Sequence, residues 1–264
     1  MWQGGEVVSP QLIWTSFFTI FRREVRRFTR IWPQTLVPPV ITMSLYFVIF
    51  GSLIGGRIGE MGGYSYMEFV VPGLIMMSVI TNSYANVVSS FYSAKFQRNV
   101  EELLVSPTPN WVVMAGYVLG GVARGLIVGL IVTVIALIFT SLSVQHIGLT
   151  ILIVFLTSVL FSLAGFINAI FANSFDDISI IPTFVLTPLT YLGGVFYSIE
   201  LLSPFWQGLS QLNPILYMVN AFRYGVLGVS DINVGWAFTG VLIFIALLSG
   251  WALHLMKHGK RLRH

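Results

Sequence analysis

Long, uninterrupted runs of apolar residues alternate along this chain with short polar segments. Each run reaches about 20 residues, the length that an α-helix needs to cross the hydrocarbon core of a bilayer. A transmembrane β-barrel would instead show apolar and polar residues alternating within segments of about ten. The pattern therefore predicts an all-α polytopic membrane protein, with residues 1–264 forming a single transmembrane domain. Its six predicted transmembrane helices are residues 32–54, 67–91, 111–139, 147–171, 178–196 and 235–256.

A different pattern precedes the first of these helices. In residues 11–31 the apolar side chains recur with helical spacing and fall on one side of the helix. The opposite side is basic, with Arg22, Arg23, Arg26, Arg27 and Arg30. This arrangement is typical of an amphipathic helix that lies in the membrane interface. We expect it to anchor the chain on membrane lipids, to contact a partner protein, or to do both.

The segment between the fifth and sixth predicted helices, residues 197–234, is too apolar for an ordinary loop outside the membrane. Breaks at Pro204 and at Asn213-Pro214 divide it into two short helices, which predicts a re-entrant helical hairpin at the outer face. The hairpin is either a structural lid or a gate over a substrate exit. The candidate gate residues are Phe205, Trp206, Asn213, Pro214, Tyr217 and Arg223.

The composition supports a membrane protein and limits its chemistry. Only 9% of the residues are charged and 56% are apolar, whereas a soluble domain has about 25% charged residues. The chain has no cysteine, which excludes disulfides and thiolate sites, and its four histidines lack metal-ligand spacing. We expect Asp176 and Asp177 to cap the helix that follows them rather than to bind a metal. The sequence contains no candidate catalytic residue and no metal site.

The distribution of basic residues predicts the orientation. Eleven of the 14 Lys and Arg residues fall before the first predicted helix, in the loop after the second, or in the tail after the sixth. Basic residues favour the cytoplasmic side, so both chain termini are predicted to be cytoplasmic. Arg57 and Arg223 then lie outside, and Arg124 lies within the third predicted helix.

The cytoplasmic loop of residues 95–110 is the most charged stretch inside the chain. Its charged side chains can share one face of a short helix; they are Lys95, Arg98, Glu101 and Glu102. Leu103 and Leu104 supply apolar anchors, and the prolines that follow end the helix. The loop is either an ordinary connection or an element that transmits force from a cytosolic partner.

Arg124 is an intramembrane candidate for function, because a cation inside the bilayer is costly. No acidic residue lies in the predicted helices to pair with it, so we expect it to cap backbone carbonyls or to pair at the cytoplasmic side. Gly121, Gly125 and Gly129 form a ridge of small residues on the same helix. This ridge favours close helix packing within one subunit over a homodimer contact.

Several motifs are absent from the sequence. It contains no G-x-x-x-x-G-K-[ST] phosphate-binding loop and no T-V-G-Y-G ion filter. Two functions remain open for the features described so far. Arg124 and the polar residues Asn82, Asn86 and Asn168 would suit an ion-gradient-driven transporter or a channel, and the basic helix would suit a non-transporting membrane scaffold.

Three ordered features resemble the membrane subunits of type-2 ABC exporters over nearly the whole chain. The first is the basic amphipathic helix. The second is the loop in which Arg98, Glu101-Glu102, Leu103-Leu104 and Ser106-Pro107 stand where the family has Arg, Glu, Leu-Leu and Thr-Pro. The third is the ordered set formed by residues 188–198, Pro204-Phe-Trp206, Leu212-Asn-Pro-Ile215 and Phe222-Arg223. Asn99-Val100 departs from the Gly-Thr that many members have, and residues 34–43 and 175–179 resemble one enterobacterial branch.

The resemblance implies a permease subunit in the bacterial inner membrane that lacks enzymatic activity of its own. Two copies would form the translocation pathway, and two copies of a separate ABC ATPase subunit, which binds ATP and Mg, would dock below. The basic helix and the charged loop would then be the connecting and coupling helices. The implied substrate is hydrophobic or amphipathic and leaves the cytoplasm, and no cofactor or nucleic acid is expected on this chain.

Overall fold

The computed structural model describes residues 9–258, apart from the side chain of Ser52, and most of these residues are helical. Within them, five helical segments are long and apolar enough to cross a membrane. The first runs from Trp32 to Ile58. The other four are α5 (Tyr66–Phe96), α7 (Asn110–Phe139), α8 (Ile147–Phe171) and α13 (Val234–His258). Part of the predicted basic tail, from residue 259 onward, lies outside the described residues.

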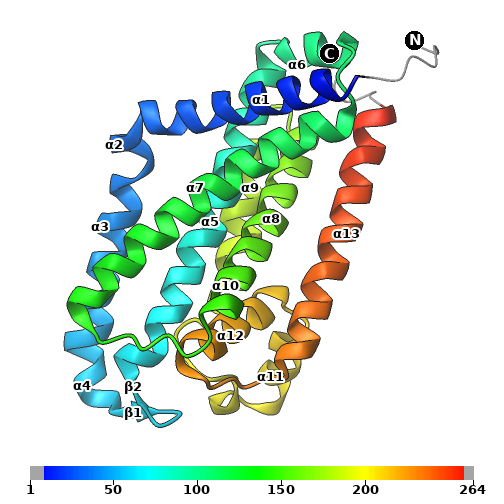
Figure 1. Ribbon diagram of the computed structural model, residues 1–264. Coiled ribbons are helices and arrows are strands. Elements are labelled where there is room, and N and C mark those ends of the chain that lie inside the picture. Colours follow the sequence, from blue (N-terminus) through cyan, green and yellow to red (C-terminus); the bar gives the residue numbers. More distant parts are fainter. Residues whose placement is uncertain (1–8, 259–264) are drawn as a thin grey trace.

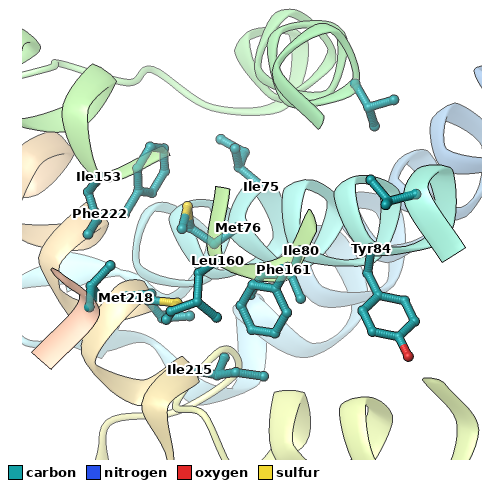
Figure 2. Packing of buried hydrophobic residues seen from close by; sticks show 14 of the residues in the cluster. Ile75, Met76, Ile80, Tyr84, Ile153, Leu160, Phe161, Ile215, Met218 and Phe222 are labelled. Carbon is teal, nitrogen blue, oxygen red and sulfur yellow. The ribbon is translucent and has the colours of Figure 1, made fainter. Parts of the chain in front are cut away.

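Helix α5 forms the centre of the bundle and packs against α7, α8 and α12 (Pro214–Leu227) (Figure 1). Its side chains are buried on nearly every face, because apolar helices surround it. Figure 2 shows Met76 and Ile80 of α5 among Leu160 and Phe161 of α8 and Met218 of α12. Most of its buried side chains are apolar, and a helix of this kind is stable in the interior of such a bundle; Asn82 and Asn86 are among the polar exceptions.

The first span is assembled from consecutive helical pieces. A short α2 (Trp32–Thr35) is followed by α3 (Val37–Tyr46), a π-helical segment η1 (Phe47–Ile54) and α4 (Gly55–Ile58). The junction at Leu36 precedes the Pro38-Pro39 pair, where the missing N–H groups and rigid rings favour the start of a new helix. A short β-hairpin connects this span to α5. Its two antiparallel strands, β1 (Glu60–Met61) and β2 (Tyr64–Ser65), have two residues each.

The fifth predicted helix differs from the structure. Residues 178–196 were expected to form one span, but the helical stretch comprises α9 (Asp177–Ile181), the π-helical η2 (Pro182–Leu186) and α10 (Thr187–Tyr191) and ends there. The causes are local: Pro182 lacks an N–H group and its ring disturbs the preceding turn, which favours the π-helical segment, and the helix ends shortly before Gly194, whose φ is 68°. The Thr187 hydroxyl bonds to the Pro182 carbonyl at 2.9 Å across the widened turn. The count of six spans therefore stays a prediction.

Several elements lie across the two ends of the bundle (Figure 1). Helix α1 (Pro10–Arg30) lies across one end, beside α6 (Asn99–Val105) and the last turn of α13. The β-hairpin, α4 and α11 (Pro204–Gln211) lie at the opposite end. The predicted helical hairpin contains a 3₁₀ turn, η3 (Ile199–Leu201), then α11 and α12, which begin at the expected prolines. Its depth in a bilayer stays a prediction.

Candidate functional site

The predicted coupling segment forms helix α6 at the same end of the molecule as α1 (Figure 1). Within this helix Val100 is buried, and Leu103 and Leu104 are partly buried against the core, as apolar anchors should be. Glu101 is half-buried and Glu102 is exposed. The helix therefore exposes the carboxylate of Glu102 on its outer side, while its apolar side packs against the bundle.

The expectation that four charged side chains share one face of this helix is wrong. Arg98 has a left-handed backbone conformation (φ 62°), which separates α5 from α6. Lys95 remains in the last turn of α5, and its ammonium group donates to the carbonyls of Ile170 and Ala172, each at 2.8 Å. Lys95 therefore caps the carboxyl end of α8, a position that favours a cation. Arg98 stands exposed at the turn.

Helix α1 is docked on the bundle by part of its basic side. Glu24, which is not among the residues predicted from the sequence, is only 1% exposed and lies 3.4 Å from both Arg23 and Arg27. Arg23 also donates to the hydroxyl of Tyr117 in α7. Arg27 donates to the side-chain and backbone oxygens of Asn86 in α5, at 2.8 and 2.9 Å. A lone acid among five arginines was the signal in the sequence that could have identified this anchor.

Arg22, Arg26 and Arg30 are exposed on α1, and so is much of Arg23, but Arg23 and Arg27 are the arginines of α1 that bond to the bundle. The basic side is therefore divided, because two arginines turn toward the bundle and three face outward. The outward set keeps the character expected of an amphipathic helix, whereas its placement in a membrane interface stays a prediction.

Glycines of α7 explain how α1 and two other helices approach it so closely. A β-carbon at Gly116 would lie 2.6 Å from the nearest atom of Ile20, and one at Gly120 would overlap Glu24. On another side of the helix, β-carbons at Gly121 and Gly125 would overlap Ser83 of α5, Ser162 of α8 or their neighbours. The glycine ridge therefore serves packing within one subunit, as predicted.

Arg124, the intramembrane candidate, lies one turn beyond this contact on α7. Its guanidinium donates to the side-chain oxygen of Asn82 at 3.1 Å and to the carbonyl of Thr35 at 3.3 Å. The second bond agrees with the expectation that it caps a carbonyl. Among residues 9–258, no carboxylate lies within ion-pair distance of it. Arg124 thus joins α7 to α5 and to the start of the first span.

The gate candidates at the other end fall into two groups. Phe205 and Trp206 of α11 are exposed, so they are free to contact lipid or another molecule. Arg223 of α12 is fully buried, donates to the carbonyls of Gly194 (2.6 Å) and Phe69 (3.3 Å), and lies 3.8 Å from the Phe69 ring centroid. A side chain held in this way joins three segments rather than lining an opening.

Asn213, Pro214 and Tyr217 form the junction between α11 and α12. Asn213 caps α12 by accepting from the backbone of Ile215 at 3.0 Å, and Pro214 occupies the first helical position. The Tyr217 hydroxyl donates to the Gln211 carbonyl at 2.8 Å. Pro214 and Tyr217 also line a cavity of about 440 Å³ that lies between this junction and α13.

The expected cap at Asp176-Asp177 is formed by one of the two residues. The Asp177 carboxylate accepts from the backbone of Asn173 (2.8 Å) and Ser174 (3.2 Å), while the Ser174 hydroxyl accepts from the backbone of Asp177 at 3.1 Å. This reciprocal pair resembles a capping box. The hydrogen bond from Asn173 and those from Ser174 hold the pKa of Asp177 below its ordinary value. Asp176 makes no side-chain cap bond, and the described residues contain no group of three potential metal ligands.

Comparison with known proteins gives a consistent family. The model of the ABC-2 type transporter family matches residues 15–227. The inner membrane transport permease YadH of Escherichia coli K12 is 61% identical over 96% of this chain and 98% of its own, in agreement with the enterobacterial branch expected above. Nodulation protein J of Neorhizobium galegae is 22% identical over 83% of this chain and 85% of its own. The chain therefore belongs to the ABC-2 type transporter family.

Proposed function

We propose that this protein is the permease subunit of an ATP-driven exporter in the bacterial inner membrane. Two copies form the pathway and move a hydrophobic or amphipathic substrate out of the cytoplasm. Family membership and the name of the YadH relative support a transport role. The proposed coupling to an ATPase rests on one observation. Helix α6 is a charged helix at the end of the bundle, and its buried apolar residues hold it in place.

We assign ATP binding, the energy source of the proposed export, to a partner protein. The chain carries no phosphate-binding loop motif, so we assign ATP and Mg to two copies of a separate ABC ATPase subunit. Glu102 and Arg98 are exposed on and beside α6, and Val105 is 74% exposed at its end. Such a mixed polar and apolar surface suits a protein contact. Leu103 and Leu104, partly buried, would pass movement of α6 to α5 and its neighbours.

The proposed orientation places α1, α6 and the end of α13 on the cytoplasmic side. These elements lie together at one end of the bundle, and the basic residues Arg22, Arg26 and Arg30 of α1 are exposed there (Figure 1). Clustering of basic residues at one end favours the cytoplasmic side. Both chain termini would then be cytoplasmic, and α11 with its exposed aromatic residues would lie at the outer face.

Charge reversal on α6 tests the coupling. We would express the tagged chain in its native host, purify it in mild detergent, identify co-purifying proteins by mass spectrometry and measure vanadate-sensitive ATP turnover. The wild type should retain an ATPase in equal amount. The double variant E101K/E102K should lose it while remaining inserted in the membrane. The control E60K/E200K makes the same charge change on exposed residues at the opposite end and should retain the ATPase.

Two results would contradict the proposal. Recovery of the wild type without any ATPase, together with transport that stops when the ion gradient is collapsed, would favour a gradient-driven transporter. Full ATPase recovery and turnover in E101K/E102K would show that α6 is not the coupling element.

A further inference from the structure

Two arginines meet at the junction of α1, α5 and α7. Arg27 of α1 is bonded to Asn86, and Arg124 of α7 is bonded to Asn82. Asn82 and Asn86 are four residues apart on α5, so they lie on one face of that helix, about 6 Å from each other. The two guanidinium groups are therefore held one helical turn apart, on the same side of α5.

This junction has more positive than negative charge. Among the described residues, Glu24 is the carboxylate that ion-pairs here, and it contacts Arg23 and Arg27 but not Arg124. The three guanidinium groups of Arg23, Arg27 and Arg124 are therefore accompanied by one ion-paired carboxylate, which contacts two of them. Neighbouring cations that are partly removed from water repel each other and lose hydration, and a bound anion would offset both costs.

Unused donors point to the same kind of ligand. The Nε atom of Arg124 and the amide nitrogen of Asn86 are buried and have no hydrogen-bond partner. Both atoms are donors, and Arg27 and Arg124 carry further N–H groups. A group that supplies several acceptor oxygens and a negative charge would satisfy them. A phosphate matches, because guanidinium groups bind phosphate oxygens in pairs.

The surroundings favour a phosphate that belongs to a membrane lipid. The Arg27 side chain is 31% exposed, so the junction can be reached from outside the bundle. Immediately after α1, Trp32 is 56% exposed, and Ile41 and Leu45 of α3 are exposed further along the first span. These apolar side chains offer a surface for acyl chains along the first span, to which Arg124 is bonded through the carbonyl of Thr35.

We propose that the junction formed by Arg27, Arg124, Asn82 and Asn86 binds the phosphate headgroup of an anionic membrane lipid. The bound lipid would bridge α1 to the α5–α7 core and hold the amphipathic helix in place. This inference concerns the isolated chain in a membrane or a micelle and does not depend on an ATPase partner. It can therefore fail or succeed separately from the proposed export function.

Native mass spectrometry of the full chain in detergent tests the site. The probes are dioleoylphosphatidylglycerol and, as the uncharged-headgroup control, dioleoylphosphatidylcholine. The wild type should retain phosphatidylglycerol preferentially. R124Q and R27Q should each lower retention about tenfold, the loss expected for one charge-assisted hydrogen bond. The matched control R22Q removes the same charge from an exposed position on α1 and should behave like the wild type.

A second measurement uses the wild-type chain alone and keeps the proposal testable if a variant does not fold. Phenylglyoxal modifies accessible arginines, and peptide mass spectrometry locates the modified residues. Phosphatidylglycerol should protect Arg27 and Arg124 while leaving Arg22 reactive. Protection by inorganic phosphate alone, at equal concentration, would mean that the site takes free phosphate rather than lipid. Equal retention of both lipids, or equal phosphatidylglycerol retention by R124Q and the wild type, would overturn the proposal.

Discussion

Ile20 of α1 lies so close to Gly116 of α7 that a β-carbon at Gly116 would be 2.8 Å from the β-carbon of Ile20. One turn further along both helices, Glu24 occupies the equivalent position over Gly120. Helix α1 therefore follows the surface of α7 for more than one turn. It is fixed to the core of the bundle by side-chain contacts in addition to whatever contacts it makes with lipid.

A disulfide tests this contact directly. Because the chain has no cysteine, the double variant I20C/G116C introduces its only two thiols. β-Carbons about 3.8 Å apart are ideal for a disulfide, so a small separation of the helices would allow one. Mild oxidation should form the bond, detected as the loss of both free thiols by mass spectrometry. The control I20C/G148C places the second cysteine in open space on α8 and should keep its thiols.

Replacement of glycine by alanine should affect stability differently in α7 and in α13. G125A adds a methyl group that would overlap Ser83, so it should destabilise the bundle by about 1–3 kcal/mol. G240A, on α13, meets no atom within 4 Å and should be neutral or slightly stabilising, because alanine favours helix more than glycine does. Thermal unfolding in detergent would compare them. An unchanged midpoint in G125A would contradict the packing described here.

The buried Arg223 predicts a large loss of stability on its replacement. R223M leaves the carbonyls of Gly194 and Phe69 without their donor, at a cost of about 1–3 kcal/mol for each buried acceptor. R57M removes the same charge from an exposed residue of α4 and should change stability by no more than about 0.5 kcal/mol. Denaturant or thermal unfolding of both variants checks this. Equal stabilities would mean that Arg223 does not hold the three segments together.

Asp177 predicts a specific dependence on pH. Its pKa is below the ordinary value in the folded protein, because Asn173 and Ser174 donate hydrogen bonds to the ionised carboxylate. The resulting stabilisation is present above the unfolded pKa of about 3.9 and is lost as the pH falls through the lower, folded value. D177N should therefore lower the unfolding temperature at pH 7 and weaken its dependence on pH below about 5.

The neighbouring variant D176N is the control for this effect, since Asp176 makes no side-chain cap bond. We expect it to keep the pH dependence of the wild type. If D176N and D177N weaken that dependence equally, the carboxylate that caps the helix has been assigned to the wrong residue.

Features that depend on the local pattern of apolar residues could be predicted well. Helix α8 begins and ends where the apolar run of residues 147–171 does, and α12 begins at Pro214 as the Asn-Pro pair indicates. The packing role of Gly121 and Gly125 also follows from their spacing, because small residues one turn apart permit close helix contact.

Features that depend on tertiary contacts could not be predicted from the local pattern of the sequence. Nothing local distinguishes Arg23 and Arg27, which turn inward, from Arg22 and Arg26, which do not. The burial of Glu24 depends on Gly120, almost 100 residues away, and only the fold brings them together. The turn at Arg98, which separates Lys95 from Glu101, is a backbone conformation that a non-glycine residue rarely adopts, so helical spacing misled the prediction.

The π-helical segments of the first span and of residues 182–186 bear on how this chain tolerates changes in length. A π-turn contains one residue more than an α-turn, so each segment accommodates a surplus residue without breaking the helix. Deleting one residue from η2 would let the turn revert to α-geometry and leave the registers of the flanking helices nearly as they are. A deletion in the regular α8 would instead rotate every later side chain by about 100°. Insertions and deletions among natural homologues should accordingly concentrate in these two segments.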